Sequence, residues 1–104
     1  MSEAGAPETS PSGEPILRRQ IRIPNRRGLH ARAAAKLVTT AEQFGAVVEV
    51  SRDGQTVAAR SIMGLMMLGA GHGSIIEVTA EGWDAKEALD AVASLIEAGF
   101  HEQD

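Results

Sequence analysis

Cysteine is absent from this chain of 104 residues, and aromatic residues make up only 3% of it. Without cysteine the chain can form neither a disulfide framework nor a thiolate metal site. A domain this small without disulfides is typical of a reducing cytoplasm. Because aromatic residues are so few, the core must be aliphatic, and the hydrophobic content of 43% is enough for one small domain.

Long hydrophobic runs are also absent. No stretch is long enough to span a membrane, and the N-terminus lacks the basic and apolar regions of a signal peptide. Residues 1–15 are rich in Pro, Gly, Ser, Glu and Ala without apolar periodicity, so we expect a disordered acidic tail there. We therefore expect this tail, one domain at 16–100 and a C-terminal tail at 101–104, in a cytoplasmic protein without membrane insertion.

Acidic residues are missing from one stretch of the chain. Seven of the ten Lys and Arg lie between Arg18 and Lys36 with no acid among them, whereas the part from Glu77 onward holds eight acids and one base, Lys86. A basic zone favours an anionic ligand or an acidic protein surface. Nucleic acid is the rival interpretation, and the modest basic total and the lack of aromatic residues argue against it.

The apolar pattern predicts an α+β fold in the order β-α-β-β-α-β-α. Alternation predicts strands at 17–23, 47–51, 55–59 and 75–80, and helical spacing predicts helices at 31–43, at 62–68 and from 85 to Gly99. Asp84 and Glu87 resemble a capping box at the start of the last helix. This order favours a four-stranded sheet with three helices on one face. If the first strand-helix-strand unit is right-handed, the fourth strand fits between the first two, antiparallel to both.

The segment Gly28-Leu29-His30-Ala31-Arg32 carries the main functional signal. Strong helix formers follow from Ala31, which predicts His30 at the N-terminal boundary of a helix. There the free N–H groups and the positive dipole suit an anion and favour a neutral, nucleophilic imidazole. Arg32 adds a guanidinium that fits phosphate oxygens. The pattern predicts a histidine that accepts, holds and passes on a phosphoryl group. The other two histidines, His72 and His101, are interpreted as ordinary residues.

Two further features have both a plain and a functional interpretation. Ser61 is a preferred N-cap residue, worth about 1 kcal/mol over alanine, and a phosphate there would be accepted by the same helix end. On the residues alone, the cap is favoured. The apolar run at 62–68 cannot all face inward, so Met63 and either Met66 or Met67 should be exposed. An adaptable docking surface and a deeply sunk helix explain this run equally well.

These motifs resemble the HPr family, the histidine-containing phosphocarriers of the bacterial phosphoenolpyruvate-dependent phosphotransferase system. The segment at 28–32 is similar to the active-site motif of that family. Ser61-Ile62-Met63-Gly64 with Leu68-Gly69 is similar to the motif around its regulatory serine, and Thr79-Ala80-Glu81-Gly82 with Asp84 to the turn before its last helix. The resemblance covers about residues 17–99 in order and spacing. It implies an open-faced β-sandwich of four antiparallel strands with three helices.

The resemblance implies that His30 is phosphorylated on Nδ1 by Enzyme I and passes the group to EIIA domains, with Arg32 supporting the phosphate. It also implies that Ser61 is a site for HPr kinase/phosphorylase. We predict that partners dock on Ala31, Ile62, Met63, Met66 and Met67. We expect a monomer that needs no metal or cofactor. A non-enzymatic phosphocarrier is favoured over an enzyme, and the question stays open because the chain forms a phosphohistidine intermediate. The alternative is a regulatory module that docks through its Met-rich face, with phosphoryl transfer secondary.

Two features depart from the family pattern. Ala33 stands where the family usually has proline, so the first turn of the helix after His30 is less rigid. The loop Asn25-Arg26-Arg27-Gly28 is more basic than in sugar-transport members and resembles the nitrogen-related branch. Because Ser61-Ile62-Met63-Gly64 resembles members with serine regulation, both branches stay open.

Overall fold

The computed structural model describes Thr9 and residues 13–102; most of the predicted N-terminal tail, together with Gln103 and Asp104, lies outside the described residues. The strands are β1 (Leu17–Arg22), β2 (Val47–Arg52), β3 (Gln55–Ala58) and β4 (Ile75–Glu81). The helices are α1 (Ala31–Ala41), α2 (Ile62–Met67) and α3 (Ala85–Glu97), and a 3₁₀ turn, η1 (Gly99–His101), follows. The predicted element order is confirmed, and η1 is an addition that the apolar pattern did not indicate.

The four strands form one antiparallel sheet in the order β1-β4-β2-β3. β4 pairs with both β1 and β2, which confirms the predicted position of the fourth strand. The β2–β3 hairpin turns at Asp53 and Gly54, whose φ angles of 50° and 83° match the left-handed conformation that a tight hairpin turn requires.

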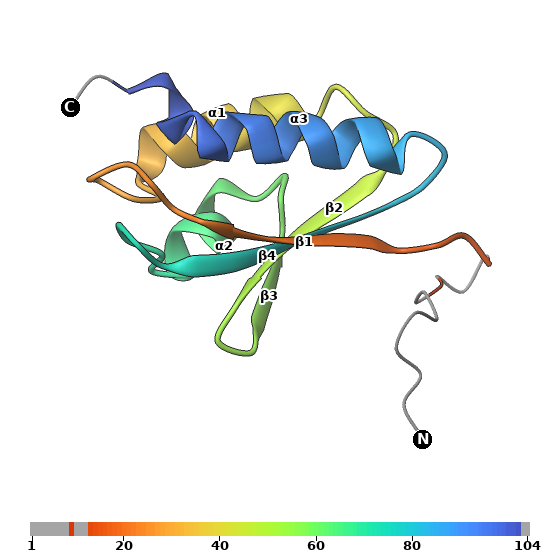
Figure 1. The fold of residues 1–104 in the computed structure, drawn as a ribbon, viewed down its shortest axis with the longest axis horizontal. Helices are drawn as coiled ribbons and strands as arrows, with labels where there is room; N and C mark the ends of the chain where they lie inside the picture. The colour runs from red at the N-terminus through yellow and green to blue at the C-terminus, as the bar shows by residue number, and fades with distance from the viewer. Residues whose placement is uncertain (1–8, 10–12, 103–104) are drawn as a thin grey trace.

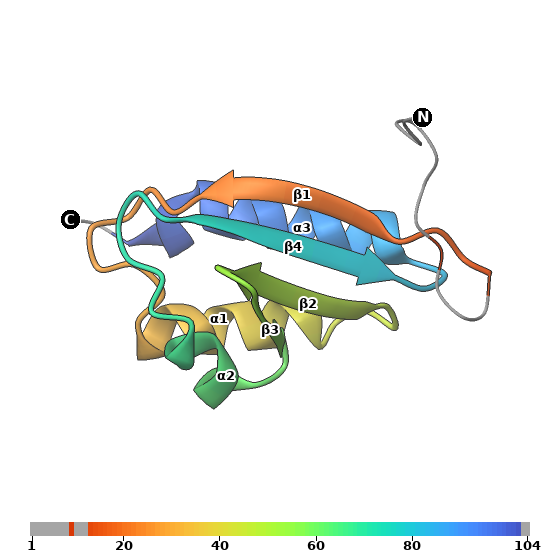
Figure 2. The same cartoon turned by 90° about the horizontal axis from the view of Figure 1, so that it is seen from below.

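Two helices cover one face of this sheet. α1 and α3 lie side by side across it, and the opposite face is seen from below in Figure 2 (Figures 1 and 2). The short helix α2 packs against α1 and against the edge strand β3. The core between the layers is largely aliphatic, as the scarcity of aromatic residues predicts, and includes the fully buried side chains of Ile23, Leu37, Ile76 and Ile96; among the described residues, Phe100 is its one fully buried aromatic side chain.

Asp84 does not form the predicted capping box. It is the N-cap of α3, but its side chain makes no capping hydrogen bond. Its buried carboxylate instead accepts hydrogen bonds from the backbone N–H groups of Gly45 at 2.9 Å and Ala46 at 2.8 Å. The carboxylate oxygens are therefore used by the loop before β2, and Asp84 ties this loop to the start of α3.

Candidate functional site

His30 is the N-cap of α1, as the sequence predicts, and its backbone is extended with φ −78° and ψ 179°. The first N–H group that donates within the helix belongs to Ala34, at 2.8 Å from the carbonyl oxygen of His30. The N–H groups of the three preceding residues lie at the open end of the helix. Together with the positive end of the helix dipole, they provide a setting for an anion beside the imidazole.

The loop before His30 is fixed to the loop before β4. The N–H of Leu29 donates to the carbonyl oxygen of Ala70 at 2.8 Å. Gly28 has φ 66°, and a Cβ atom there would lie 2.6 Å from both the Ala70 oxygen and the Cα of Gly71. Glycine at this position therefore allows a close backbone contact that sets the entry to α1.

Glu102 is the site residue that sequence reasoning missed. Nε2 of His30 contacts Oε2 of Glu102, and Oε1 of Glu102 accepts a 3.0 Å hydrogen bond from Nδ2 of Asn25. Only 15% of the His30 side chain and 11% of the Glu102 side chain are exposed. Glu102 falls in the segment that was expected to be a C-terminal tail. The sequence holds one indication of this contact. Phe100 is an apolar residue beyond the end of the last helix, and its burial in the core would bring the residues that follow it, Glu102 included, back to the domain.

The surroundings of Glu102 favour its ionised form. Burial acts to raise the pKa of Glu102, but hydrogen bonds from His30 and Asn25 and the charges of His30 and Arg27 outweigh it. The pKa of this carboxyl therefore lies below its ordinary value. Because a carboxylate only accepts hydrogen bonds, Nε2 of His30 donates in this contact.

Asn25 supports the site from the loop. It is buried, and its Nδ2 also donates to the carbonyl oxygen of Gly28 at 2.9 Å. Nδ1 of His72 lies 3.4 Å from the backbone oxygen of Asn25, so this histidine lies against the loop that leads to His30.

Arg32 lies on the first turn of α1 and is exposed. It makes no ion pair with any residue that the structure describes. Beside it, a groove of about 440 Å³ is lined by residues of α1, α3 and η1, among them Arg32, Lys36, Thr39, Leu95 and His101. The guanidinium is thus available to an anion at the N-terminal end of α1.

Ser61 caps α2 as predicted, because its Oγ accepts a 2.9 Å hydrogen bond from the N–H of Gly64. The apolar residues that follow are exposed: Ile62 by 40%, Met63 by 70%, Met66 by 43% and Met67 by 73%. The prediction of exposed methionines is confirmed. α2 lies beside α1 (Figures 1 and 2), whose first residue, Ala31, is also exposed.

The described part of the chain offers neither a cluster of metal-ligating side chains nor a membrane-spanning helix. Within Thr9 and residues 13–102, no group of three or more His, Asp or Glu side chains could hold a metal ion. Among the same residues, no helix has the length and apolar character needed to cross a membrane.

Comparison with known proteins places the site in a family. Residues 17–98 match the family described as the PTS HPr component phosphorylation site. The chain belongs to the HPr family. The phosphocarrier protein HPr of Cupriavidus necator is 48% identical over 87 residues, which cover 84% of this chain and 98% of that protein. The phosphocarrier protein NPr of Shewanella violacea is 43% identical over 86 residues, or 83% of this chain and 94% of that protein.

The fold of the HPr family is shared as well. The crystal structure of HPr from Thermoanaerobacter tengcongensis superposes with a TM-score of 0.81 at 43% identity and covers 85% of this chain and 99% of that one. The predicted α+β fold is thereby confirmed, and the chain is an HPr-family phosphocarrier of the phosphotransferase system. Because both an HPr and an NPr are similar to it, the sugar and nitrogen-related branches stay open.

Proposed function

We propose that this HPr-family protein accepts a phosphoryl group from Enzyme I on Nδ1 of His30 and passes it to EIIA-type acceptors. The observation that carries the proposal is the position of His30 as the N-cap of α1, two residues before Arg32, which makes no ion pair with any residue that the structure describes. In the first step, a bond forms between Nδ1 and phosphorus while the bond from phosphorus to the donor atom of Enzyme I breaks. The electron pair of that bond leaves with the donor.

The helix end supports this step electrostatically. A phosphoryl group brings about two negative charges to the imidazole. The free N–H groups of the first turn and the guanidinium of Arg32 oppose that charge. The positions of the N–H groups are set by the backbone of α1, so these groups need no rearrangement when the phosphoryl group arrives.

We further propose that partners dock on the apolar surface beside the site, which is formed by Ala31, Ile62, Met63, Met66 and Met67. Their exposure supports this role, because flexible methionines adapt to more than one partner surface.

Ser61 at the start of α2 is proposed as a site for HPr kinase/phosphorylase. Its place as a helix N-cap supports this, since a phosphate there meets free N–H groups. The carrier is proposed to act as a monomer in the cytoplasm.

The test is phosphorylation of the purified chain by Enzyme I and phosphoenolpyruvate. We expect an acid-labile, alkali-stable phosphate on the wild type and on His72→Ala, and none on His30→Ala. Circular dichroism should show that His30→Ala is folded, because truncating a helix-boundary residue costs about 1 kcal/mol. Labelling of folded His30→Ala at the wild-type level contradicts the proposal.

A second candidate function follows from the exposed methionines Met63 and Met67. In this alternative, the protein is a regulatory module that binds partners through this surface, with phosphoryl transfer secondary. In that case the double variant Met63→Ser with Met67→Ser no longer binds or regulates the partner, whereas His30→Ala still does. If His30→Ala loses the protein's effect on the partner and the double variant keeps it, the phosphocarrier function is supported.

A further inference from the structure

We propose that Glu102 is a positioning residue for phosphoryl transfer, whose carboxylate holds the imidazole proton of His30 on Nε2 and so keeps Nδ1 as the nucleophile. This inference rests on the proposed function and deepens it. It starts from the contact between Nε2 of His30 and Oε2 of Glu102, two side chains largely shielded from solvent.

The carboxylate of Glu102 is held at both oxygens. While Oε2 faces His30, Oε1 accepts from Nδ2 of Asn25, and the same Nδ2 donates to the carbonyl oxygen of Gly28. This orientation leaves the buried Oδ1 of Asn25 without a partner among the described residues. Such an unsatisfied atom costs stability. The opposite orientation of the amide is worse, because Oδ1 of Asn25 would then face the carbonyl oxygen of Gly28 and Oε1 of Glu102, and neither of these can donate a hydrogen bond. The amide is therefore set to orient the carboxylate, which in turn orients the ring.

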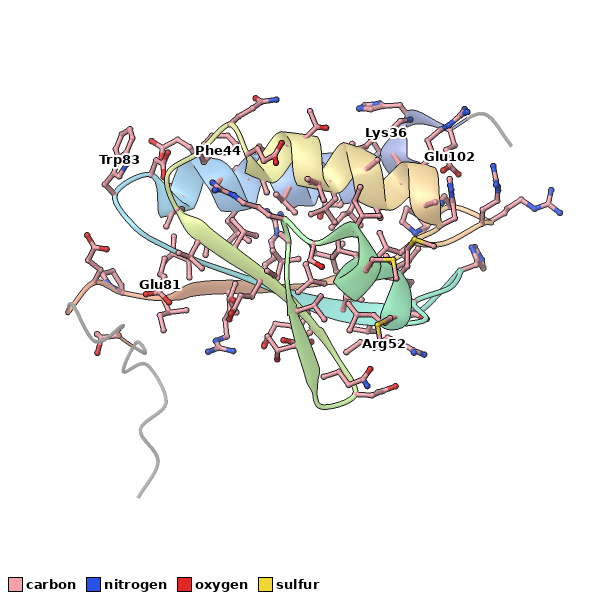
Figure 3. All side chains as sticks on the ribbon, turned by 180° about the vertical axis from the view of Figure 1, so that it is seen from behind. Lys36, Phe44, Arg52, Glu81, Trp83 and Glu102 are labelled. Carbon is pink, nitrogen blue, oxygen red and sulfur yellow. The ribbon has the colours of Figure 1, made fainter. Side chains whose placement is uncertain are left out.

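The backbone that delivers Glu102 is strained and anchored. Gly99, Phe100 and His101 have φ angles of 64°, 58° and 59°. Phe100 and His101 thus have a left-handed backbone, which is uncommon for residues other than glycine. Phe100 is fully buried, and Nζ of Lys36 donates to its carbonyl oxygen at 2.6 Å. Lys36 lies midway along α1, and Figure 3 shows Glu102 beyond it, beside the N-terminal end of that helix. Strain of this kind persists where the surrounding structure over-determines it, often at functional sites. The fold therefore builds the contact with His30.

The chemistry explains what the contact does. A neutral imidazole carries its proton on either nitrogen, and only the form protonated on Nε2 has a free electron pair on Nδ1. When Nδ1 attacks phosphorus, the bond to the donor breaks and its electron pair leaves with the donor. The proton stays on Nε2, so the phosphorylated ring is positively charged beside the carboxylate. In onward transfer the electron pair of the Nδ1–P bond returns to Nδ1, and no proton moves in either direction.

The experiment compares four full-length proteins: wild type, Glu102→Gln, Glu102→Ala and the control Glu42→Gln. Glu42 is an exposed acid at the opposite end of α1 from His30, so the control removes the same charge far from the site. The first measurement is ¹⁵N NMR of the ring nitrogens of unphosphorylated His30 in mildly alkaline buffer. We expect one form, protonated on Nε2, in the wild type and the control, and a mixture of both forms in Glu102→Ala.

The second measurement is the rate of phosphorylation by Enzyme I and the ring atom that carries the phosphate. At metal sites, loss of a carboxylate that orients a ligating histidine typically lowers activity about ten- to a hundredfold, and we take the lower end of that range for His30. We therefore expect Glu102→Ala to be about tenfold slower than the control and to carry part of its phosphate on Nε2. Glu102→Gln should lie between, because its amide can still accept a hydrogen bond but carries no charge.

The NMR and rate measurements can overturn the proposed role of Glu102. An unchanged proton distribution in both Glu102 variants overturns the inference, even if the rate falls, because Glu102 then acts only on structure or docking. If Glu102→Ala does not fold, Glu102→Gln decides on the same two measurements. Failure of the proposed function looks different: folded His30→Ala is labelled, or the wild type is not. The NMR measurement on unphosphorylated protein is independent of that result.

Discussion

The carbonyl oxygen of Ala70 accepts a hydrogen bond from the N–H of Leu29 at 2.8 Å. The loop before β4 thus holds the residue directly before His30. Gly28 lies at the same contact with a left-handed backbone, where a Cβ atom would come within 2.6 Å of the Ala70 oxygen. The orientation of the His30 side chain therefore depends on Gly28, a residue that has no side chain to take part in phosphoryl transfer.

Gly28→Ala should destabilise the fold and slow phosphorylation. A left-handed alanine costs about 1–2 kcal/mol, and the clash with backbone atoms adds to it, so we expect a loss of at least about 2 kcal/mol. The control is Gly71→Ala in the facing loop, where a Cβ atom would meet open space. Urea unfolding of both variants measures the difference. Equal losses would show that the contact with Ala70 is not tight.

The parts of the site that depend on neighbouring residues could be predicted from the sequence. The helix boundary at His30, the cap at Ser61 and the exposure of Met63 each follow from residues within one or two turns of helix. Hydrophobic alternation similarly predicted the strands, and the right-handed crossover rule predicted the place of the fourth strand.

The parts that depend on distant contacts could not be predicted. Glu102 reaches His30 across 72 residues of sequence, through a turn in which Phe100 and His101 take a conformation uncommon for their residue types. Asp84 finds its donors at Gly45 and Ala46, 39 and 38 residues away. In both cases a carboxylate meets partners that only the tertiary fold brings close, so a local motif such as a capping box is an incomplete guide.

Asp84→Ala should be among the more destabilising substitutions of a single polar residue. It removes the acceptor of two backbone N–H groups, and hydrogen bonds to a charged group are worth about 1.5–3 kcal/mol each. Because Gly45 is exposed and water can replace one partner, we expect a total loss of about 2–4 kcal/mol. The matched control is Glu87→Ala, an exposed acid in the first turn of the same helix, with an expected change within about 0.5 kcal/mol. Thermal unfolding of the two variants ranks them, and similar midpoints would contradict the role of Asp84.

Arg32→Ala should slow phosphoryl transfer without preventing it. The free N–H groups of the first turn of α1 still oppose part of the charge. Losing one charge-assisted hydrogen bond of about 1.5–3 kcal/mol predicts a rate about ten- to a hundred-fold lower if the bond forms in the transition state. Rapid-quench kinetics with phosphorylated Enzyme I measure the rate, and Arg60→Ala, at the far end of α1 near Phe44, serves as the control. A wild-type rate in Arg32→Ala would place Arg32 outside the site.

The contact of Glu102 should contribute stability that depends on pH. The pKa of Glu102 is lowered in the folded protein from an ordinary 4.5, and the groups that face it are His30, Asn25 and Arg27. A carboxyl with a lowered folded pKa contributes fully above its unfolded pKa and loses this contribution as the pH falls through the folded value. We expect the difference in unfolding free energy between wild type and Glu102→Gln to shrink below about pH 4.5. Urea unfolding at stepped pH tests this, and a difference that persists into strong acid would refute it.

Ser61→Asp should keep the fold and weaken the encounter with Enzyme I. Aspartate is also a preferred N-cap residue, so α2 should keep its cap. The new charge lies next to the exposed Ile62 and Met63, where it repels an acidic partner and makes the apolar contact harder to desolvate. We expect phosphorylation by Enzyme I to slow roughly three- to tenfold at low salt, the equivalent of about 1 kcal/mol.

Salt and two matched variants separate this charge effect from loss of the cap. Exposed charges are screened over about 8–10 Å at physiological ionic strength, so the deficit of Ser61→Asp should shrink as salt rises. Ser61→Ala lacks the cap and adds no charge; it should lose about 1 kcal/mol of stability and keep the wild-type rate. Ser94→Asp adds the same charge on an exposed position of α3 and should also keep the wild-type rate. If Ser61→Asp and Ser94→Asp are equally fast at low salt, then Ser61 serves this protein only as the cap of α2.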